Sequence, residues 1–350
     1  MINVRAIAGL ALIALLSFSA DSASAETPAP DIVTVGITNS GTDVALLVAA
    51  KLGYFKEQGI DAKFVPFDAA GKMMAPLAVG QLDVATGAPS AALYNALASN
   101  VNVKIVADKG SAAPGYGFQP IFVRKALITS GKYKSPKDLK GLTVAEGSPG
   151  SVAAVFVAKF LKLGGLKYSD VTHIYLGFPS MAAALENGAI DAAALAEPAA
   201  TLAERGGYAV RVMGNDQIYP NQQLTVLMYS GSFSTDRHSV AERFMVAYLM
   251  GVRFYNDALV GGHLRGRTAN EVVTILTDET NAKDPSIFRA MTASANDPNG
   301  HLNVASLKAD AAALHELGFL TTPVPNLNDV IDQSFAIAAV KTLGVYRPHK

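Results

Sequence analysis

Residues 77–85 read Leu-Ala-Val-Gly-Gln-Leu-Asp-Val-Ala, and residues 185–193 read Leu-Glu-Asn-Gly-Ala-Ile-Asp-Ala-Ala. In both stretches the pattern predicts a helix that ends at glycine, a turn through aspartate and a short apolar strand. A proline follows each stretch, Pro89 and Pro198, where the next helix is expected to begin. Such a repeat predicts two similar α/β lobes. The alternative is coincidence, because Gly-x-x-Asp before a strand is also a common exit from a helix.

The residues around the first stretch predict a parallel βαβ unit. Strands are expected at 32–37 and 62–67, with an amphipathic helix between them that carries Val44, Leu47 and Val48 on one face. Ser40 and Asp43 have the spacing of a capping box at the start of this helix, although Glu or Gln is usual at the second position. This half of the chain is therefore expected to form the first α/β lobe.

The second stretch lies in a comparable setting. Its predicted elements are a strand at 142–145, a tight loop at 146–151, a helix at 152–163, a strand at 171–176, a helix capped by Ser180, and strands at 189–195 and 209–212. Apolar extended segments at 119–123 and 224–229 flank this lobe and are expected to cross between the lobes. From residue 236 onward the pattern is mostly helical and should pack back on the first lobe.

These expectations divide the chain into three parts. Residues 1–25 are a predicted signal peptide, residues 26–118 together with 224–350 form lobe I, and residues 119–223 form lobe II. The crossings, and with them a hinge, are expected near 117–124 and 220–230.

The N-terminus has the features of a secretory signal. Arg5 precedes an apolar run at 6–18, and Ala23-Ser24-Ala25 offers a small-x-small cleavage site, so we expect cleavage after Ala25 and a periplasmic protein. The apolar run is shorter than the ~20 residues that span a bilayer, although an uncleaved anchor remains the alternative. With no cysteine in the chain, neither a lipid anchor on cysteine nor a disulfide can form. The net charge of zero argues against nucleic-acid binding.

Several motifs, taken in order and with their spacing, resemble one family. They are Leu-Gly-Tyr-Phe-Lys-Glu-Gln-Gly-Ile at 52–60, Gly-Gln-Leu-Asp at 80–83, Gly-Ala-Pro-Ser at 87–90, Asp-Leu-Lys-Gly at 138–141, Gly-Ser at 147–148, Ala-Ile-Asp-Ala at 189–192, Glu-Pro at 197–198, Asn-Gly-His-Leu-Asn at 299–303 and Ala-Ala-Val-Lys-Thr-Leu-Gly at 338–344. Over nearly the whole mature chain, the sequence resembles the nitrate/sulfonate/taurine branch of ABC-transporter solute-binding proteins, which also includes binders of aromatic acids and vitamin precursors. The resemblance implies two Rossmann-like lobes joined by a two-strand hinge, the type II periplasmic-binding-protein fold, with the ligand in the cleft between the lobes. It also implies a membrane permease and a cytoplasmic ATPase as partners, and it names no ligand.

Loops after strands, at the starts of helices, are where ligands bind in open α/β sheets, and their free N–H groups suit anions. Four loops qualify, at 39–42, 87–90, 147–151 and 197–198. The candidate ligand-binding residues are Asn39, Ser40, Gly41, Thr42, Ala88, Pro89, Ser90, Lys109, Ser148, Gly150, Ser151 and Glu197.

Each candidate also has a purely structural interpretation. Ser90 and Ser151 could be ordinary helix caps, and Gly150 could serve a tight turn. Lys109 could neutralise an anion or be solvated, and Glu197 could accept from a ligand or pair with a basic side chain across the cleft. Three aromatic residues near the expected cleft, Tyr116, Phe118 and Phe178, could stack on a planar ligand, but packing in the core or hinge is the preferred interpretation.

The sequence favours a binding protein over an enzyme. It contains no Gly-x-Ser-x-Gly elbow, no phosphate-binding loop and no histidine spacing typical of a metal site, so no catalytic residue, metal or cofactor is predicted. Vitamin-biosynthesis enzymes of the same broad fold carry a cysteine-rich motif that this chain lacks. The predicted function is capture of a small organic, anionic ligand by a monomer that closes around it. A periplasmic sensor that reports to a signalling receptor remains the alternative.

Overall fold

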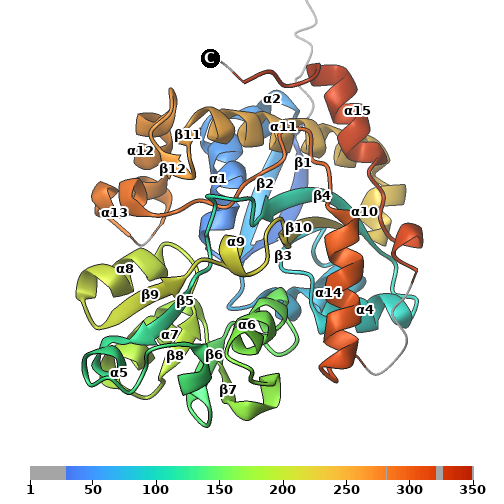
Figure 1. Ribbon diagram of the computed structural model, residues 1–350. Helices are drawn as coiled ribbons and strands as arrows, with labels where there is room; N and C mark the ends of the chain where they lie inside the picture. Colours follow the sequence, from blue (N-terminus) through green and yellow to red (C-terminus); the bar gives the residue numbers. More distant parts are fainter. Residues whose placement is uncertain (1–28, 281, 321–325, 349–350) are drawn as a thin grey trace, which may run out of the picture.

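The computed structural model describes residues 29–280, 282–320 and 326–348. The predicted signal peptide and its cleavage site after Ala25 lie outside these residues. Two lobes are visible in Figure 1, and each is built on one five-stranded sheet with helices packed against it. The α/β class and the two-lobed architecture predicted from the sequence are therefore confirmed.

The sheet of lobe I has the strand order β2-β1-β3-β10-β4. Its strands are β1 (Asp31–Ile37), β2 (Ile60–Pro66), β3 (Val84–Gly87), β4 (Val103–Ser111) and β10 (Gln223–Ser230). Strands β2 and β3 run parallel to β1, whereas β10 is antiparallel to both of its neighbours.

The sheet of lobe II repeats this plan with the order β7-β6-β8-β5-β9. Its strands are β5 (Ile121–Arg124), β6 (Thr143–Glu146), β7 (Thr172–Tyr175), β8 (Ala192–Ala194) and β9 (Ala209–Met213). Here β7 and β8 run parallel to β6, and β5 is antiparallel to its neighbours. The fourth position of each sheet is thus filled by an antiparallel strand.

The repeated sequence stretches occupy equivalent places, immediately before β3 and β8. Asp83 accepts the backbone N–H of Thr34 on β1 (2.8 Å), and Asp191 accepts the N–H of Thr143 on β6 (3.1 Å). Each aspartate also pairs with an arginine, Asp83 with Arg237 at 2.9 Å and Asp191 with Arg124 at 2.7 Å. The repeat is therefore structural, and its aspartate joins the end of a helix to the adjacent strand.

The crossings between the lobes lie beside the segments expected from the sequence. Segments 119–123 and 224–229 fall largely within strands β5 and β10, where their apolar side chains are buried in the sheets. The chain instead crosses at 112–120 and 214–222. These two crossings are joined by backbone hydrogen bonds between Ala112 and Gln222 (2.9 Å) and between Asn221 and Ala112 (2.7 Å).

Helices cover both sheets. In lobe I they are α1 (Val44–Lys51), α2 (Tyr54–Glu57), α3 (Met74–Ala78), α4 (Ala91–Ala98), α10 (Gly231–Thr235), α11 (His238–Asp257), α12 (Ala269–Glu279), α13 (Pro285–Ala290), α14 (Val304–Glu316) and α15 (Ser334–Leu343). In lobe II and the second crossing they are α5 (Lys125–Thr129), α6 (Val152–Leu163), α7 (Phe178–Asn187), α8 (Ala199–Gly206) and α9 (Asn215–Ile218); a short hairpin of β11 (Leu259–Val260) and β12 (His263–Leu264) precedes α12. Ser180 does not cap α7 as expected, because the helix begins two residues earlier and Pro179 suits its first turn.

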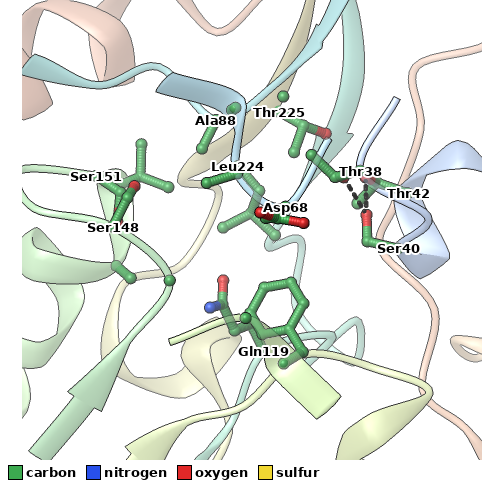
Figure 2. A pocket seen from close by; sticks show the side chains of 18 of the residues that line it. Thr38, Ser40, Thr42, Asp68, Ala88, Gln119, Ser148, Ser151, Leu224 and Thr225 are labelled. Atoms are coloured by element: carbon green, nitrogen blue, oxygen red, sulfur yellow. Dashed lines mark hydrogen bonds between the residues drawn. The ribbon is translucent and has the colours of Figure 1, made fainter. Parts of the chain in front are cut away.

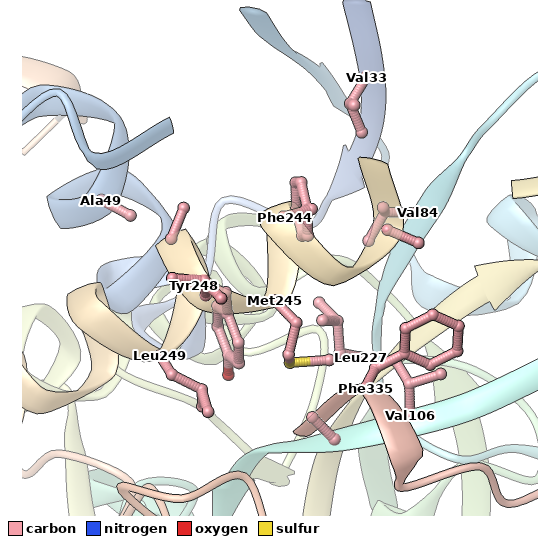
Figure 3. Packing of buried hydrophobic residues seen from close by; sticks show 14 of the residues in the cluster. Val33, Ala49, Val84, Val106, Leu227, Phe244, Met245, Tyr248, Leu249 and Phe335 are labelled. Atoms are coloured by element: carbon pink, nitrogen blue, oxygen red, sulfur yellow. The ribbon is translucent and has the colours of Figure 1, made fainter. Parts of the chain in front are cut away.

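The largest core lies under α11. Phe244, Met245 and Tyr248 of this helix pack on Leu227 of β10 and on Phe335 of α15 (Figure 3). Helix α15 thus packs with α11 on the sheet of lobe I. Within the described ranges, no helix combines the length and the apolar character needed to cross a membrane.

Glu146, buried at the end of β6 in lobe II, is hydrogen-bonded to the partly buried ring of His173. Glu146 Oε1 accepts hydrogen bonds from the Tyr168 hydroxyl and from His173 Nδ1, both at 2.7 Å. His173 Nε2 lies 2.8 Å from the Tyr168 carbonyl oxygen, which can only accept, so Nε2 is a donor and the arrangement favours a ring protonated on both nitrogens. Burial opposes this charge, but the hydrogen bonds to Glu146 and Tyr168 outweigh it and raise the pKa of His173.

The two lobes touch through their main chains. The Ala91 N–H of α4 donates to the Gly150 carbonyl (2.8 Å), and the Gly41 N–H donates to the Glu197 carbonyl (3.2 Å). Gly150 has a φ of +57°, and a Cβ added there would lie 2.7 Å from Ala91 Cβ and 2.9 Å from Phe319 Cγ, both in lobe I. Glycine at this position thus allows the lobes to approach.

We predict that His173→Gln destabilises the protein at about pH 6 by more than at about pH 9. A raised histidine pKa adds stability below the unfolded value of ~6.5, and this stability is lost as the pH rises through the folded value. Thermal unfolding followed by circular dichroism measures the difference in Tm between variant and wild type at each pH. The buried carboxyls of Asp108 and Asp310 have pKa values raised to about 7, so they also make the stability depend on pH. Because both proteins contain them, the difference in Tm between variant and wild type cancels this dependence. The exposed His238→Gln is the control, and a pH-independent effect of His173→Gln would contradict the raised pKa of His173.

We predict that Gly150→Ala shifts the protein toward separated lobes. Gly165→Ala is the matched control, because Gly165 also has a positive φ (+72°) but an added Cβ there meets nothing within 4 Å. Both variants should lose about 1–2 kcal/mol for the left-handed backbone. Only Gly150→Ala should also enlarge the radius of gyration in small-angle X-ray scattering. Equal radii for the two variants would refute a role for Gly150 in bringing the lobes together.

Candidate functional site

A cavity lies where the two lobes meet, and both lobes and a crossing segment form its walls (Figure 2). Lobe I contributes three hydroxyl side chains from the loop after β1, which are Thr38, Ser40 and Thr42. Lobe II contributes the loop after β6, with Ser148 and Ser151. Because β1 and β6 are equivalent strands, their carboxyl ends face the same space from opposite sides.

The lobe I hydroxyls form one hydrogen-bonded cluster. Ser40 Oγ lies 2.9 Å from Thr42 Oγ1 and accepts from Thr38 Oγ1 at 3.1 Å. The Asp43 carboxylate accepts the backbone N–H groups of Ser40 (3.0 Å) and Thr38 (3.2 Å), which fixes the turn and matches the predicted capping-box spacing. This turn holds the three hydroxyl groups at the cavity wall.

Lys109 stands behind this wall rather than in it. Its side chain is fully buried, and Nζ lies 2.6 Å from Asp43 Oδ1 and 2.9 Å from Thr42 Oγ1. The sequence offered Lys109 as a cation for the ligand or as a solvated residue. The structure shows a third arrangement, in which Asp43 neutralises the ammonium before any ligand could reach it.

The lobe II wall offers hydroxyl groups at the start of a helix. Ser151 is the N-cap residue of α6, yet its side chain makes no capping hydrogen bond, so the hydroxyl is free to face the cavity. Ser90, which forms an isolated β-bridge with Ser151, does cap its own helix, accepting the Leu93 N–H at 3.4 Å, and it does not line the cavity. The structural interpretation therefore fits Ser90 better than Ser151.

The rest of the cavity is largely apolar. Phe118, Phe178 and Leu224 line it, so these two aromatic side chains face the cleft as well as packing together. Gln119 also lines it and is 7% exposed. Its Nε2 donates to the Ala194 carbonyl at 3.1 Å, and its amide oxygen points into the cavity in Figure 2.

Charge at the cavity is confined to its rim. Among the described lining residues, Asp68 alone carries a charge, and its exposed carboxylate pairs with Lys72 at 2.7 Å. The hydrogen bond and charge of Lys72 lower the pKa of Asp68. In the described part of the chain, no group of three or more His, Asp or Glu side chains is arranged to hold a metal ion.

Glu197 lies outside the cavity and has protein partners. Its side chain is fully buried, with Oε1 2.7 Å from Arg211 Nη2 and Oε2 accepting the Thr201 N–H at 2.9 Å. Oε1 also accepts the Thr292 N–H of lobe I at 3.3 Å. Of the two interpretations of Glu197, the structure supports pairing with a basic side chain, and Arg211 belongs to the same lobe.

Five of the twelve candidate residues line the cavity: Ser40, Thr42, Ala88, Ser148 and Ser151. The other seven lie around it and do not line it: Asn39, Gly41, Pro89, Ser90, Lys109, Gly150 and Glu197. Asn39 provides a left-handed turn (φ 52°), and Gly41 lies against Phe118, where a Cβ would approach the ring to 2.8 Å. Residues that the sequence did not single out also line it, among them Thr38, Asp68, Gln119, Leu176, Leu224 and Thr225. Thr38 was detectable in principle, because it directly follows the predicted strand 32–37.

Comparison with known proteins gives one family and several relatives. The family model described as NMT1/THI5 like matches residues 42–257. A putative aliphatic sulfonates-binding protein of Escherichia coli (strain K12) is 28% identical over 252 residues, which cover 71% of this chain and 72% of that protein. The periplasmic nitrate-binding protein NrtA from Synechocystis PCC 6803 has a similar structure, with a TM-score of 0.74, 13% identity, and coverage of 92% of this chain and 91% of that one.

An enzyme shares the architecture as well. The desulfurization enzyme DszB superposes with a TM-score of 0.64 and 15% identity, covering 89% of this chain and 99% of that chain. At such low identity, these structures establish the fold and do not distinguish a binding protein from an enzyme.

The family model spans more than half of the chain, including both crossings and the loops at 42, 87–90 and 147–151. The resemblance read from the sequence motifs is thereby confirmed, and the chain belongs to the NMT1/THI5-like family.

Proposed function

We propose that this chain is the solute-binding component of an ABC importer, which captures a small organic ligand with an anionic head and delivers it to a membrane permease. The observation that carries the proposal is a cavity whose polar groups come from both lobes, Ser40 and Thr42 on one side and Ser148 and Ser151 on the other. A ligand that contacts both walls stabilises the arrangement with the lobes together over any arrangement with them apart. Export to the periplasm and a monomeric state are part of the same proposal.

The chemistry of the walls favours an oxyanion attached to an apolar group. Hydroxyl protons and helix-start N–H groups donate hydrogen bonds, and sulfonate or carboxylate oxygens only accept them. Phe118, Phe178 and Leu224 would cover an alkyl or aromatic portion of the ligand. A bare inorganic ion such as nitrate would leave these apolar side chains without a partner. The aliphatic sulfonates named for the Escherichia coli relative combine both parts, so we propose sulfonates as the first ligand class to test.

Hydrogen bonds from neutral donors suffice for such a ligand. A fully desolvated lysine facing the ligand would bind any anion strongly, whereas Lys109 is already neutralised by Asp43. Binding would therefore depend on the number and direction of hydroxyl donors, which discriminates between anions by geometry. The affinity needed for scavenging, about 8 kcal/mol at micromolar Kd, is within reach of several such bonds together with apolar burial.

We predict that purified mature protein is stabilised by at least one alkanesulfonate or arenesulfonate in a thermal-shift screen. The screen should also contain aromatic carboxylates, nitrate, and pyrimidine and flavin precursors. For the ligand that binds, the double variant Ser148→Ala/Ser151→Ala should lose at least about tenfold in affinity by calorimetry, because two charge-assisted hydrogen bonds are removed. Its Tm without ligand should match that of wild type.

Ser99→Ala is the control, because Ser99 is exposed at the end of α4 and does not line the cavity. It should bind like wild type. Affinity of the double variant within twofold of wild type would remove the lobe II wall from the proposed site. Conversion of the bound compound to a product by the purified chain would overturn the assignment as a binding protein.

A further inference from the structure

The hydroxyl cluster of lobe I has a hydrogen-bond direction that Lys109 sets from behind. An ammonium group has protons and no lone pair, so Thr42 Oγ1, 2.9 Å from Lys109 Nζ, must accept. The Thr42 proton therefore points away from Lys109. Both side chains of the Lys109–Asp43 pair are fully buried, so water does not compete for these positions.

Counting protons along the cluster gives a definite result. Ser40 and Thr42 share one hydrogen bond of 2.9 Å, and either can donate it. Thr38 donates to Ser40 at 3.1 Å, with Asp43 Oδ2 a more distant acceptor at 3.5 Å. If Thr42 donates to Ser40, the Ser40 proton is unused; if Ser40 donates to Thr42, the Thr42 proton is unused. Because Thr42 cannot donate toward Lys109, either case leaves one hydroxyl proton at the cavity wall, which both residues line.

Without Lys109 this arrangement would reverse. Asp43 would then be a negative charge directly behind the wall, held by the N–H groups of Thr38 and Ser40. An uncompensated carboxylate draws hydroxyl protons toward itself and repels an anion in the cavity. Lys109 cancels the charge of Asp43 and at the same time occupies a lone pair of Thr42.

We propose that Lys109 is a positioning residue that makes the Ser40–Thr42 wall a hydrogen-bond donor and so selects ligands with an oxyanion over neutral ligands of the same shape. This inference rests on the proposed function. Lys109 would act through Thr42 and never touch the ligand, in contrast to a lysine that binds an anion directly.

The test compares propane-1-sulfonate with methyl propyl sulfone, a neutral molecule of similar shape, by calorimetry on the full mature chain. Three variants are made: Lys109→Met, Lys109→Met combined with Asp43→Asn, and Thr42→Val. Thr42→Ser, which keeps the hydroxyl, is the matched control for Thr42→Val. The double variant removes both charges, which proteins tolerate far better than one unpaired buried charge. If Lys109→Met does not fold, the double variant therefore replaces it as the test of Lys109.

The expected result is a loss of sulfonate affinity of about tenfold or more in all three variants, with sulfone affinity changed by about twofold or less. The double variant should regain the Tm lost in Lys109→Met but not the sulfonate affinity, and Thr42→Ser should bind like wild type. A role confined to stability predicts the opposite, recovery of both properties in the double variant. If neither the double variant nor Thr42→Val folds, failure of Thr42→Ser to fold as well would count against the inference, because Thr42→Ser keeps the hydroxyl group that accepts from Lys109.

Two failures are distinguishable. If wild type binds propane-1-sulfonate and the variants still prefer the sulfonate to the sulfone, Lys109 does not set the direction of the hydrogen bonds in the Ser40–Thr42 wall. This inference is then overturned. If wild type binds no anion of the panel at all, the proposed function itself falls, and the inference falls with it.

Discussion

The whole arrangement depends on a topological constraint: the sheet of lobe I is completed only after the chain has passed through lobe II and returned. Strand β5 enters the lobe II sheet only after the first crossing, and β10 enters the lobe I sheet only after the second. Both are antiparallel to their neighbours, and each crossing leaves an edge strand of one sheet, β4 or β9, and enters the interior of the other sheet at β5 or β10. The crossings are therefore short and bonded to one another, and the carboxyl ends of β1 and β6 must face each other across the gap. A cavity between the lobes follows from this connection.

Buried ionic groups around the cavity are matched within the protein. Lys109 is paired with Asp43, and Glu197 with Arg211. Glu146, which immediately precedes the lobe II loop, is paired with the ring of His173, whose pKa its hydrogen bond raises. Removing an ion from water is costly unless a partner compensates for it, so these pairs keep the walls electrically neutral while fixing their geometry. Apart from Asp68 at the rim, the polar contacts offered to a ligand are then those of uncharged hydroxyl and amide groups.

The sequence predicted the architecture better than the site. The repeat of Gly-x-x-Asp located equivalent strands in both lobes, because a helix exit and the strand it feeds are local features of the chain. The serine loops were also found from local pattern. The pairing of Lys109 was not, since Thr42 is 67 residues away and a lysine after an apolar run looks alike whether it is solvated, ligand-binding or buried. Gln119 and Thr225 were missed for the same reason, because the positions of β5 and β10 bring them to the cavity.

Two of the contacts that join the lobes are made by the main chain, between Ala91 and Gly150 and between Gly41 and Glu197. Side chains add to them, because Arg205 of lobe II donates to Ser286 of lobe I at 2.6 Å. None of these contacts is made by a residue that lines the cavity, so the residues that hold the lobes together are encoded separately from those that face a ligand. A lineage that exchanges Ser148 or Thr42 for other residues changes what the cavity accepts without rebuilding how it shuts. This separation gives one scaffold room to diversify in specificity, and it offers protein engineers a clamp whose lining can be redesigned.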